Sequence, residues 1–328
     1  MGAESENDLV TAGVHGDLPA GAELRRVGRM SLGPVPRPFS LHRTALSHGW
    51  CSLAPTAYDE VRGVLHRTLA LPDAGPLTVS VRQRPDGRLE ASWGRADGTC
   101  ADRISVKQQL RRMLALDDDL AELYAACRDD PATSWICELA VGRLLRSPTV
   151  FEDLVKTLTT TNCSWALTRS MCRRLVDVLG AAGPAGERAF PTAGALASAG
   201  EDVLRDEIRA GYRSRAFVDL GAAVDSGRLD PERWLASHPA AGHDDDEVRA
   251  QMAALRGFGP YASQGMLGLL GRPRGLALDS WVRAKLPAVL GRPAMTDAEI
   301  AARYAPFGRW GGTVLWLELT RDWFAPAT

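Results

Sequence analysis

Two glycines and a proline stand between two helical patterns, in the sequence Gly257-Phe258-Gly259-Pro260. The glycines permit positive φ and a close approach of other groups, and Pro260 suits the first position of a helix, where no N–H donor is lost. The amides at the start of that helix can bind one DNA phosphate without reading the base sequence. A second interpretation is an ordinary helical hairpin whose glycines only end a helix. This motif alone does not distinguish a DNA-binding hairpin from an ordinary one.

Asp279 lies about twenty residues after this motif, between an apolar stretch and a helical pattern that begins at Ser280. An aspartate there can cap the helix N-terminus, which is one sufficient explanation for it. The functional interpretation is a carboxylate at the mouth of a helical cleft, close to a hairpin that holds the DNA backbone. We predict that hairpin over residues 247–270.

The first 104 residues of the chain lack helical periodicity. Residues 1–25 are rich in Gly, Ala, Asp and Glu, which predicts a flexible tail. Residues 26–104 contain two runs in which apolar and polar residues alternate, separated by the turn-forming residues 84–88. The alternating apolar residues are Leu77, Val79, Val81, Leu89, Ala91 and Trp93. This pattern predicts a β-hairpin with one apolar face, within a β-rich N-terminal domain.

From residue 105 to the end, residue 328, the apolar period becomes helical. The first stripe has the spacing of an amphipathic helix and consists of Val106, Leu110, Met113 and Leu114. Thr149 with Glu152, and Thr296 with Glu299, predict two capping boxes at later helix starts. We therefore predict an α+β fold, with a β-rich domain over 26–104 and a helical domain over 105–328.

Composition excludes several classes of protein. The 39 basic and 40 acidic residues give a net charge of −1, so a nucleic-acid partner must bind a local patch. No apolar run is long enough to span a membrane, and the acidic N-terminus does not resemble a secretion signal, so we expect an intracellular protein. The six cysteines lack C-x-x-C spacing, and we interpret residues 243–246 as a helix start, so we predict no metal site.

The sequence resembles the helix-hairpin-helix (HhH-GPD) DNA glycosylase superfamily, nearest to its 8-oxoguanine glycosylase and 3-methyladenine glycosylase II branches. The resemblance rests on residues 255–262 and 276–283. Weaker similarity at residues 116–120, 153–171 and 211–215 extends it over about residues 105–325. It implies a β-rich N-terminal domain followed by a mostly α-helical HhH-GPD domain of two helical subdomains, with the site in the cleft between them.

By this resemblance, Asp279 is the catalytic carboxylate. Breaking an N-glycosidic bond builds positive charge on the sugar, and a fixed anion stabilises that charge or helps water to attack. Bifunctional members carry an attacking lysine where this chain has Tyr261, so we expect a monofunctional glycosylase that leaves an abasic site. If an amine did take part, Lys156 and Lys285 would be the candidates, and both also suit a solvated helix face.

The resemblance also implies DNA contacts. Asn162 is similar to the asparagine that fills the gap left by an extruded nucleotide. Tyr212 resembles the aromatic wedge that bends the duplex, with Arg213 beside it. A turn residue and a half-buried ring are the other interpretations of Asn162 and Tyr212. The predicted contacts of the hairpin are Gly257, Phe258, Gly259 and Tyr261.

The base pocket departs from the 8-oxoguanine branch. Gly312, Trp316 and Gly265 stand where that branch has a glutamine, a phenylalanine and a cysteine, so the hydrogen-bonding and thiol contacts are missing. A large aromatic surface remains, which suits a cationic, alkylated purine. Core packing is the other interpretation of Trp310, Trp316 and Trp323. Oxidised and alkylated purines both stay open, and we favour alkylated purines slightly.

These expectations combine into a DNA glycosylase of base excision repair. It would act as a monomer on double-stranded DNA that contains a damaged base, without an organic cofactor, in the cytoplasm and at the nucleoid. In the family manner, carbonyls of the hairpin can hold a monovalent cation. One alternative is a non-catalytic module that binds distorted or damaged duplex. Another is an enzyme specialised for bulky or natural-product adducts. Only the volume of the pocket would distinguish it from an enzyme that acts on smaller lesions.

Overall fold

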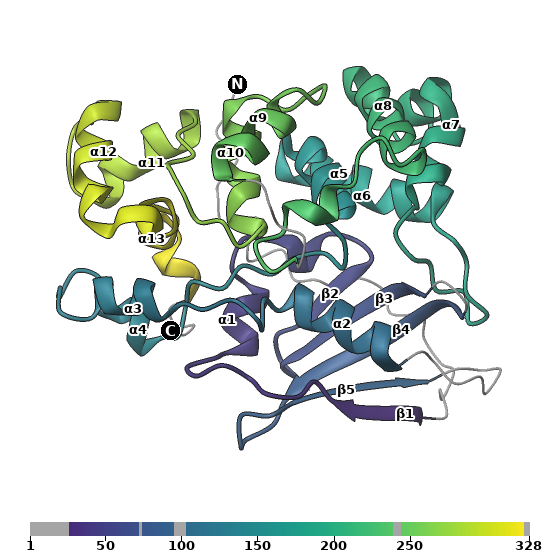
Figure 1. Cartoon of the computed structure of the whole chain (residues 1–328), viewed down its shortest axis with the longest axis horizontal. Helices are drawn as coiled ribbons and strands as arrows, with labels where there is room; N and C mark the ends of the chain where they lie inside the picture. The colour runs from purple at the N-terminus through teal and green to yellow at the C-terminus, as the bar shows by residue number, and fades with distance from the viewer. Residues whose placement is uncertain (1–25, 72–73, 95–102, 239–243, 325–328) are drawn as a thin grey trace.

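The structure, a computed structural model, describes residues 26–71, 74–94, 103–238 and 244–324. The predicted tail, residues 1–25, lies outside these ranges. One antiparallel β-sheet forms a layer of its own, and helices form the larger part of the molecule (Figure 1). This arrangement confirms the predicted α+β class with its β-rich N-terminal part.

The sheet has the strand order β1-β5-β4-β3-β2. Its strands are β1 (Arg26–Ser31), β2 (Thr56–Asp59), β3 (Val64–Leu71), β4 (Gly75–Gln83) and β5 (Leu89–Gly94). The predicted hairpin corresponds to β4 and β5, and the Arg84 amide donates a hydrogen bond to the Arg88 carbonyl across its turn. Leu77, Val79 and Val81 are fully buried, as their alternation predicts.

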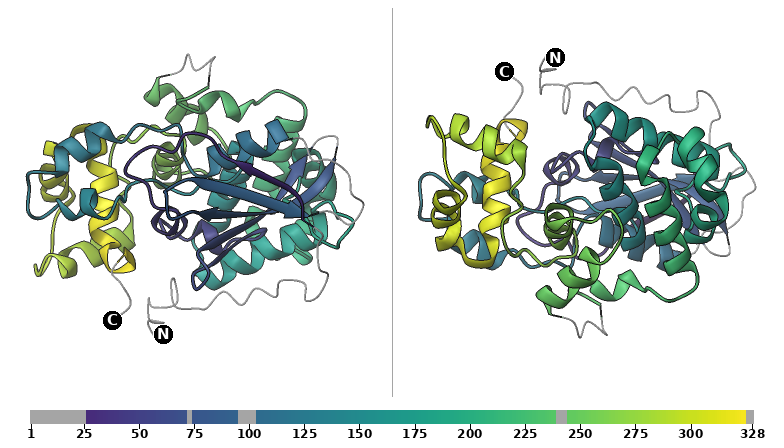
Figure 2. Two further views of the ribbon diagram at one scale, coloured as in Figure 1. Left: turned by 90° about the horizontal axis from the view of Figure 1, so that it is seen from below. Right: turned by 90° about the horizontal axis from the view of Figure 1, so that it is seen from above.

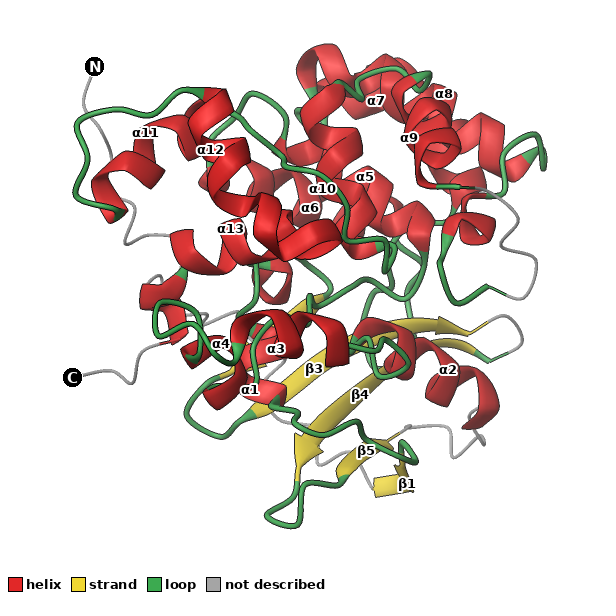
Figure 3. Ribbon diagram, turned by 60° about the vertical axis from the view of Figure 1, so that its left-hand side comes forward, coloured by secondary structure: helices red, strands yellow, loops and turns green. Residues whose placement is uncertain are grey.

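Helix α2 (Arg103–Met113) packs against the sheet at β3 (Figure 3). The apolar stripe predicted for it is fully buried. The helix begins inside the predicted β-rich range 26–104, because its first turn is held by the sheet: Arg103 donates to the Arg29 carbonyl at 2.9 Å and stacks on Trp93. The domain boundary near residue 105 therefore stays a prediction.

Helices account for most of the described chain outside the sheet. They are α1 (Leu41–Ala45), α3 (Ala121–Cys127), α4 (Trp135–Glu138), α5 (Val150–Thr160), α6 (Trp165–Leu179), α7 (Ala193–Asp206), α8 (Ser214–Asp225), α9 (Asp245–Ala253), α10 (Pro260–Leu269), α11 (Ser280–Val289), α12 (Asp297–Tyr304) and α13 (Gly311–Leu319). The predicted capping box at Thr296 is complete, and Asp244 forms another one ahead of α9. The acidic run before Glu247 is thus a helix start.

The apolar core consists of two clusters. The first joins the buried face of the sheet to α2 and to helices α5–α10, whereas the second joins α3 and α4 to α11–α13. Figure 2 shows α3 beside the C-terminal helices, at the opposite end of the molecule from α7 and α8. The helical part therefore has two subdomains, and the second combines α3 and α4 with the C-terminal helices α11–α13.

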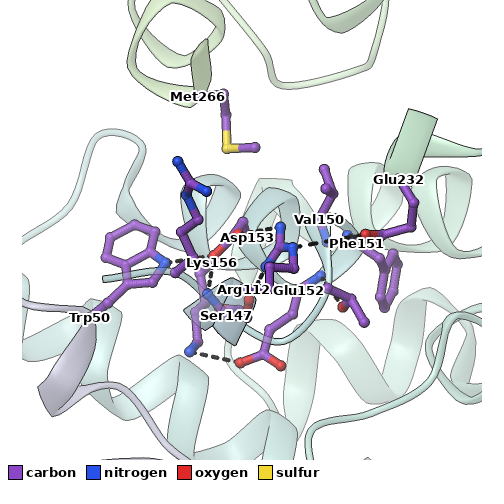
Figure 4. A network of polar contacts seen from close by, with 12 residues as sticks. Trp50, Arg112, Ser147, Val150, Phe151, Glu152, Asp153, Lys156, Glu232 and Met266 are labelled. Atoms are coloured by element: carbon purple, nitrogen blue, oxygen red, sulfur yellow. Dashed lines mark hydrogen bonds and ion pairs between the residues drawn. The ribbon is translucent and has the colours of Figure 1, made fainter. Parts of the chain in front are cut away.

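Helix α5 lies at the centre of the first cluster, and all side chains from Val150 to Thr159 are buried. A buried carboxylate such as that of Glu152 is costly unless it is paired. Arg67 of β3 donates to both of its oxygens, at 2.7 and 2.6 Å. The Lys156 ammonium lies 2.8 Å from one of these oxygens (Figure 4). These charges fix the sheet against the helix.

The predicted capping box at Thr149 is only half formed. The Thr149 hydroxyl accepts a hydrogen bond from the Glu152 amide at 3.2 Å, as expected for an N-cap. The Glu152 side chain, however, does not return to the Thr149 amide, because it turns inward to Arg67 and Lys156. Two buried cations attract the carboxylate more strongly than one backbone N–H does.

Replacing Glu152 tests this buried pairing. Glu152→Gln is expected to lower the free energy of unfolding by about 3–5 kcal/mol, because Arg67 and Lys156 would stay buried without their counter-charge. Glu90→Gln is the matched control, since its partner Arg29 is exposed and such a pair contributes less than about 1 kcal/mol. Urea unfolding measures both variants, and equal losses would contradict the assignment.

The carboxylate of Glu152 also makes the free energy of unfolding depend on pH. Burial raises the pKa of Glu152, but Arg67 and Lys156 outweigh burial and lower the pKa to about 2, from an ordinary value of 4.5. A carboxyl with a lowered pKa stabilises the folded state above its unfolded pKa, and this stabilisation is lost as the pH falls through the folded pKa. The wild type should therefore lose unfolding free energy from about pH 4.5 down to about pH 2, and Glu152→Gln should lose less.

Candidate active site

The predicted hairpin is formed by α9 and α10. Gly257 between them has a φ of 88°, and a Cβ on this residue would lie 2.7 Å from a methyl group of Leu158. Both facts require glycine there. Gly259 is the N-cap of α10 and offers no side chain to its first amides, while Pro260 occupies the first turn. The start of α10 is thus left open to an external acceptor, as the sequence predicts.

The side chain of Phe258, between the two hairpin glycines, lies in the core. Its ring is buried in the first apolar cluster, with 5% of the residue exposed. A side chain in that position cannot reach a DNA strand. The predicted contact at this residue is therefore left to the main chain, and the ring anchors the hairpin to the core.

Asp279 is half-buried and forms the N-cap of α11, where its Oδ1 accepts the Val282 amide at 2.8 Å. Both interpretations of this residue are compatible, because one oxygen caps the helix while the residue also lines a cavity. The phenol of Tyr261 on α10 faces the same carboxylate. Burial first, and then the charge and hydrogen bonding of Asp279, raise the pKa of Tyr261 to about 12.

The cavity has a volume of about 630 Å³ and contains the predicted pocket residues together with Asp279 and Tyr261. The predicted pocket residues Gly265, Gly312 and Trp316 all line it. The two glycines differ: no atom lies within 4 Å of a Cβ added to Gly265, whereas a Cβ on Gly312 would lie 2.2 Å from the Gly275 carbonyl oxygen. Gly312 is therefore required by packing, and Gly265 leaves open space.

Three tryptophans form an aromatic wall near Asp279, which we call the C-terminal aromatic cluster: Trp281, Trp316 and Trp323. The ring centroids of Trp281 and Trp316 are 5.8 Å apart, and those of Trp316 and Trp323 are 5.7 Å apart. The indole N–H of Trp316 donates to the Ser47 carbonyl at 2.8 Å, which connects this wall to the N-terminal domain. Trp310, by contrast, is buried in the second apolar cluster, as its core-packing interpretation predicts.

Sequence analysis missed a second aromatic cluster in the same cavity: His48, Trp50 and Trp165. The rings of His48 and Trp50 are 4.6 Å apart, and Trp165 of α6 packs against Gly49 so closely that a Cβ there would lie 2.8 Å from its ring. Burial lowers the pKa of His48 to about 4, so its imidazole is neutral at pH 7. Only the aromatic residues around Gly49 signal this cluster in the sequence.

Trp50 is held by the buried carboxylate of Asp153 on α5. Its indole N–H donates to Asp153 Oδ1 at 2.9 Å, and the same carboxylate accepts bonds from the Ser147 amide and from Arg112 (Figure 4). A carboxylate with three donors is fixed in orientation. Asp153 therefore sets the position of one wall of the cavity.

The predicted DNA-contact loops meet on the surface next to this cavity. Asn162, exposed with a φ of 48°, has its amide nitrogen 3.3 Å from the hydroxyl of Tyr212, which is 65% exposed. Arg213 is different, because its buried guanidinium donates to Thr161 and lies over the Tyr212 ring. Asn162 and Tyr212 are thus available to a partner, and Arg213 joins their two loops.

The fold that carries this site also occurs in solved structures of other proteins. No protein-family model matches the chain, and no curated protein matches it. Among solved structures, MBOgg1 in complex with a low-affinity DNA ligand has a TM-score of 0.66 at 18% identity, over 87% of this chain and 92% of that one. The 3-methyladenine DNA-glycosylase of Archaeoglobus fulgidus also has a TM-score of 0.66 at 18% identity, over 90% of this chain and 98% of that one.

The apo form of an 8-oxoguanine glycosylase/lyase of Clostridium acetobutylicum has a TM-score of 0.65 at 19% identity, over 88% of this chain and 93% of that one. The chain has the fold of these HhH-GPD DNA glycosylases. The resemblance found in the sequence is therefore confirmed at the level of the fold.

Within this glycosylase fold, the two candidate amines lie in different surroundings. Lys156 is fully buried and paired with Glu152, so it cannot reach a nucleotide in the cavity. The ammonium of Lys285 lies 5.0 Å from the ring centroid of Trp281, a residue that lines the cavity. Lys285 is thus the one of the two that lies next to the site.

The described ranges contain no group of three or more His, Cys, Asp or Glu residues placed to hold a metal ion. The monovalent cation at the hairpin stays a prediction. In the same ranges, no helix combines the length and the apolar character that crossing a bilayer requires.

The two pocket glycines give a matched pair of variants. Gly312→Ala is expected to lower the free energy of unfolding by about 1–3 kcal/mol, because its methyl group would overlap the Gly275 carbonyl. Gly265→Ala meets no atom and should be neutral or stabilising by up to about 1 kcal/mol, since alanine favours a helix. Denaturant unfolding of both proteins measures the contrast, and equal stabilities would show that the packing at Gly312 is wrongly assigned.

Proposed function

We propose that the protein is a DNA glycosylase of base excision repair that flips a damaged purine into the cavity and hydrolyses its N-glycosidic bond. One observation carries the proposal: the carboxylate of Asp279 lines an aromatic cavity that also contains the start of the hairpin helix α10. This chemistry needs three parts: main-chain amides that hold the DNA backbone, an anion next to the sugar, and an aromatic surface on which the base stacks. The fold shared with known DNA glycosylases supports the same conclusion.

In the proposed reaction, the carboxylate acts on the sugar. As the glycosidic bond breaks, positive charge develops at C1′ and the ring oxygen, and Asp279 stabilises it electrostatically. Water then attacks C1′ and transfers a proton to the carboxylate. The Val282 amide holds one carboxylate oxygen at 2.8 Å, so the group is oriented before substrate arrives.

We further propose that the enzyme is monofunctional. A lyase reaction needs an amine that attacks C1′, and the position expected for it carries the phenol of Tyr261. That phenol faces Asp279 and has a raised pKa, so it stays protonated and cannot act as a nucleophile at neutral pH. The salt bridge of Lys156 removes a second candidate.

The substrate that the lining favours is an alkylated, positively charged purine. Three polar side chains of the cavity are hydrogen-bonded within the protein: Gln264 donates to the Arg274 carbonyl, Thr157 to Met266, and Trp316 to Ser47. These three donors are therefore not free to read the hydrogen-bonding edge of an oxidised base. Aromatic faces and one carboxylate instead attract a cation.

The partner in this proposal is duplex DNA with a damaged base. Exposed Asn162 and Tyr212 would enter the base stack, and the first amides of α10 would bind a phosphate. A single copy of the chain supplies the hairpin, the carboxylate and the cavity, which supports action as a monomer.

Asp279→Asn is the direct test of catalysis. Asparagine caps a helix as well as aspartate does, so the fold should persist, but the negative charge is lost. We expect base release from alkylated DNA to fall by on the order of a hundredfold or more, with duplex binding retained. Mass analysis of released bases and a binding titration measure the two effects. Wild-type release by the variant would remove Asp279 from the mechanism, and binding without release by the wild type would favour a non-catalytic module.

Borohydride reduction during turnover tests the monofunctional assignment. Because Tyr261 cannot form a Schiff base and Lys156 is buried in a salt bridge, less than a few per cent of the enzyme should become covalently attached to DNA. Denaturing gel electrophoresis detects the trapped complex. Efficient trapping that disappears in Lys285→Ala would overturn the assignment and identify the amine.

A further inference from the structure

The cavity beside Asp279 is larger than a single base requires. Its volume is about 630 Å³. A purine has about eleven non-hydrogen atoms and fills roughly 150–200 Å³ at the packing density of protein interiors. Cavities of the observed size are typical of sites for much larger ligands. Space therefore remains after a flipped purine has taken its place next to the carboxylate.

The remaining space has its own stacking surface. The C-terminal aromatic cluster begins two residues after Asp279, at Trp281, and can stack on the flipped purine. The second cluster, His48, Trp50 and Trp165, comes from the N-terminal domain and from α6. A base can stack on one or both of its faces, but the volume left beside a single purine gives the second cluster room to stack on another planar part of the ligand.

The second cluster suits a hydrocarbon better than a polar ring. The indole N–H of Trp50 is bonded to Asp153 at 2.9 Å, and Nε2 of His48 is bonded to the Leu145 carbonyl at 2.6 Å. A polar base edge placed there would lose water without gaining those partners, which is costly. An aromatic hydrocarbon loses no hydrogen bond and gains contact with the rings.

We infer that the site accepts purines that carry a planar polycyclic aromatic substituent on a ring nitrogen such as N7. The purine lies beside Asp279, and the substituent lies against His48, Trp50 and Trp165. This inference rests on the proposed glycosylase function. In the reaction, water bonds to C1′ and gives a proton to Asp279, while the C1′–N9 bond breaks and its electron pair neutralises the cationic purine.

The experiment uses the full-length protein and duplexes with one guanine alkylated at N7 by a methyl, benzyl, naphthylmethyl or pyrenylmethyl group. Released bases are quantified by mass analysis, and kcat/KM is obtained after subtraction of the spontaneous loss measured without enzyme. We expect naphthylmethylguanine to exceed methylguanine in kcat/KM by about tenfold or more, which corresponds to about 1.4 kcal/mol.

The outcomes separate the inference from the function on which it rests. Release of methylguanine with equal or slower release of the arylmethyl bases would overturn the inference and leave the glycosylase function standing. Release of none of the four bases would overturn both. A rate that rises with the number of rings supports both.

Two variants of Trp165 locate the effect. Trp165→Ala should reduce the naphthylmethyl-to-methyl ratio about tenfold, whereas Trp165→Phe, which keeps a ring, should retain most of the wild-type ratio. Leu167→Ala is the control on the same helix, since Leu167 is exposed and does not line the cavity. Thermal unfolding verifies that each variant is folded. A Trp165→Ala protein that is folded and keeps the wild-type ratio would overturn the placement of the substituent.

A cavity-filling variant provides an independent test. Gly268→Leu adds a side chain inside the cavity, where the nearest atom to its Cβ is the flexible end of Leu144, at 3.2 Å. Leucine also favours the helix more than glycine does, so folding should be retained. The naphthylmethyl-to-methyl ratio should fall about tenfold or more. An unchanged ratio would mean that the substituent does not use this space.

Discussion

The buried pairing of Arg67 with Glu152 is the constraint on which the arrangement of the other elements depends. A shift of β3 along α5 would separate two desolvated charges, and an unpaired buried charge costs several kcal/mol. The pairing therefore selects one register between sheet and helix. Asp153, the next residue of α5, then positions Trp50, and the same helix ends immediately before the loop that carries Asn162. One helix that carries buried charges into an apolar core thus sets both a wall of the cavity and a surface loop.

The candidate chemistry depends equally on a capping interaction. Asp279 is fixed because α11 needs an N-cap, and its Oδ1 is bonded to the Val282 amide. A residue that starts a helix has a defined main-chain conformation, so its carboxylate needs little reorganisation when charge develops on a substrate. Local folding and the proposed catalysis therefore make the same demand on this position, and the two interpretations of it do not compete.

Sequence patterns predicted the features that local physics determines. The hairpin depends on glycine at a positive φ and proline in a first turn, and the N-cap at Asp279 depends on neighbouring residues. Patterns failed where distant residues decide. The Thr149 capping box is incomplete because Arg67, which is distant in the sequence, attracts the Glu152 carboxylate. The sequence pattern did not predict the second aromatic cluster, His48, Trp50 and Trp165. Only tertiary packing brings these residues to the cavity, and hydrophobic periodicity carries no information about such packing.

The carboxylate and the second aromatic cluster come from segments that are far apart in the chain, and the hairpin does not include either Trp50 or Trp165. Mutations around Gly49 can therefore reshape the second aromatic cluster while the residues of α10 and Asp279 stay unchanged. In the proposed glycosylase, such mutations would change which lesion is recognised and leave the reaction unchanged. Proteins of this fold would then diverge toward different genotoxic compounds through changes in a short N-terminal segment.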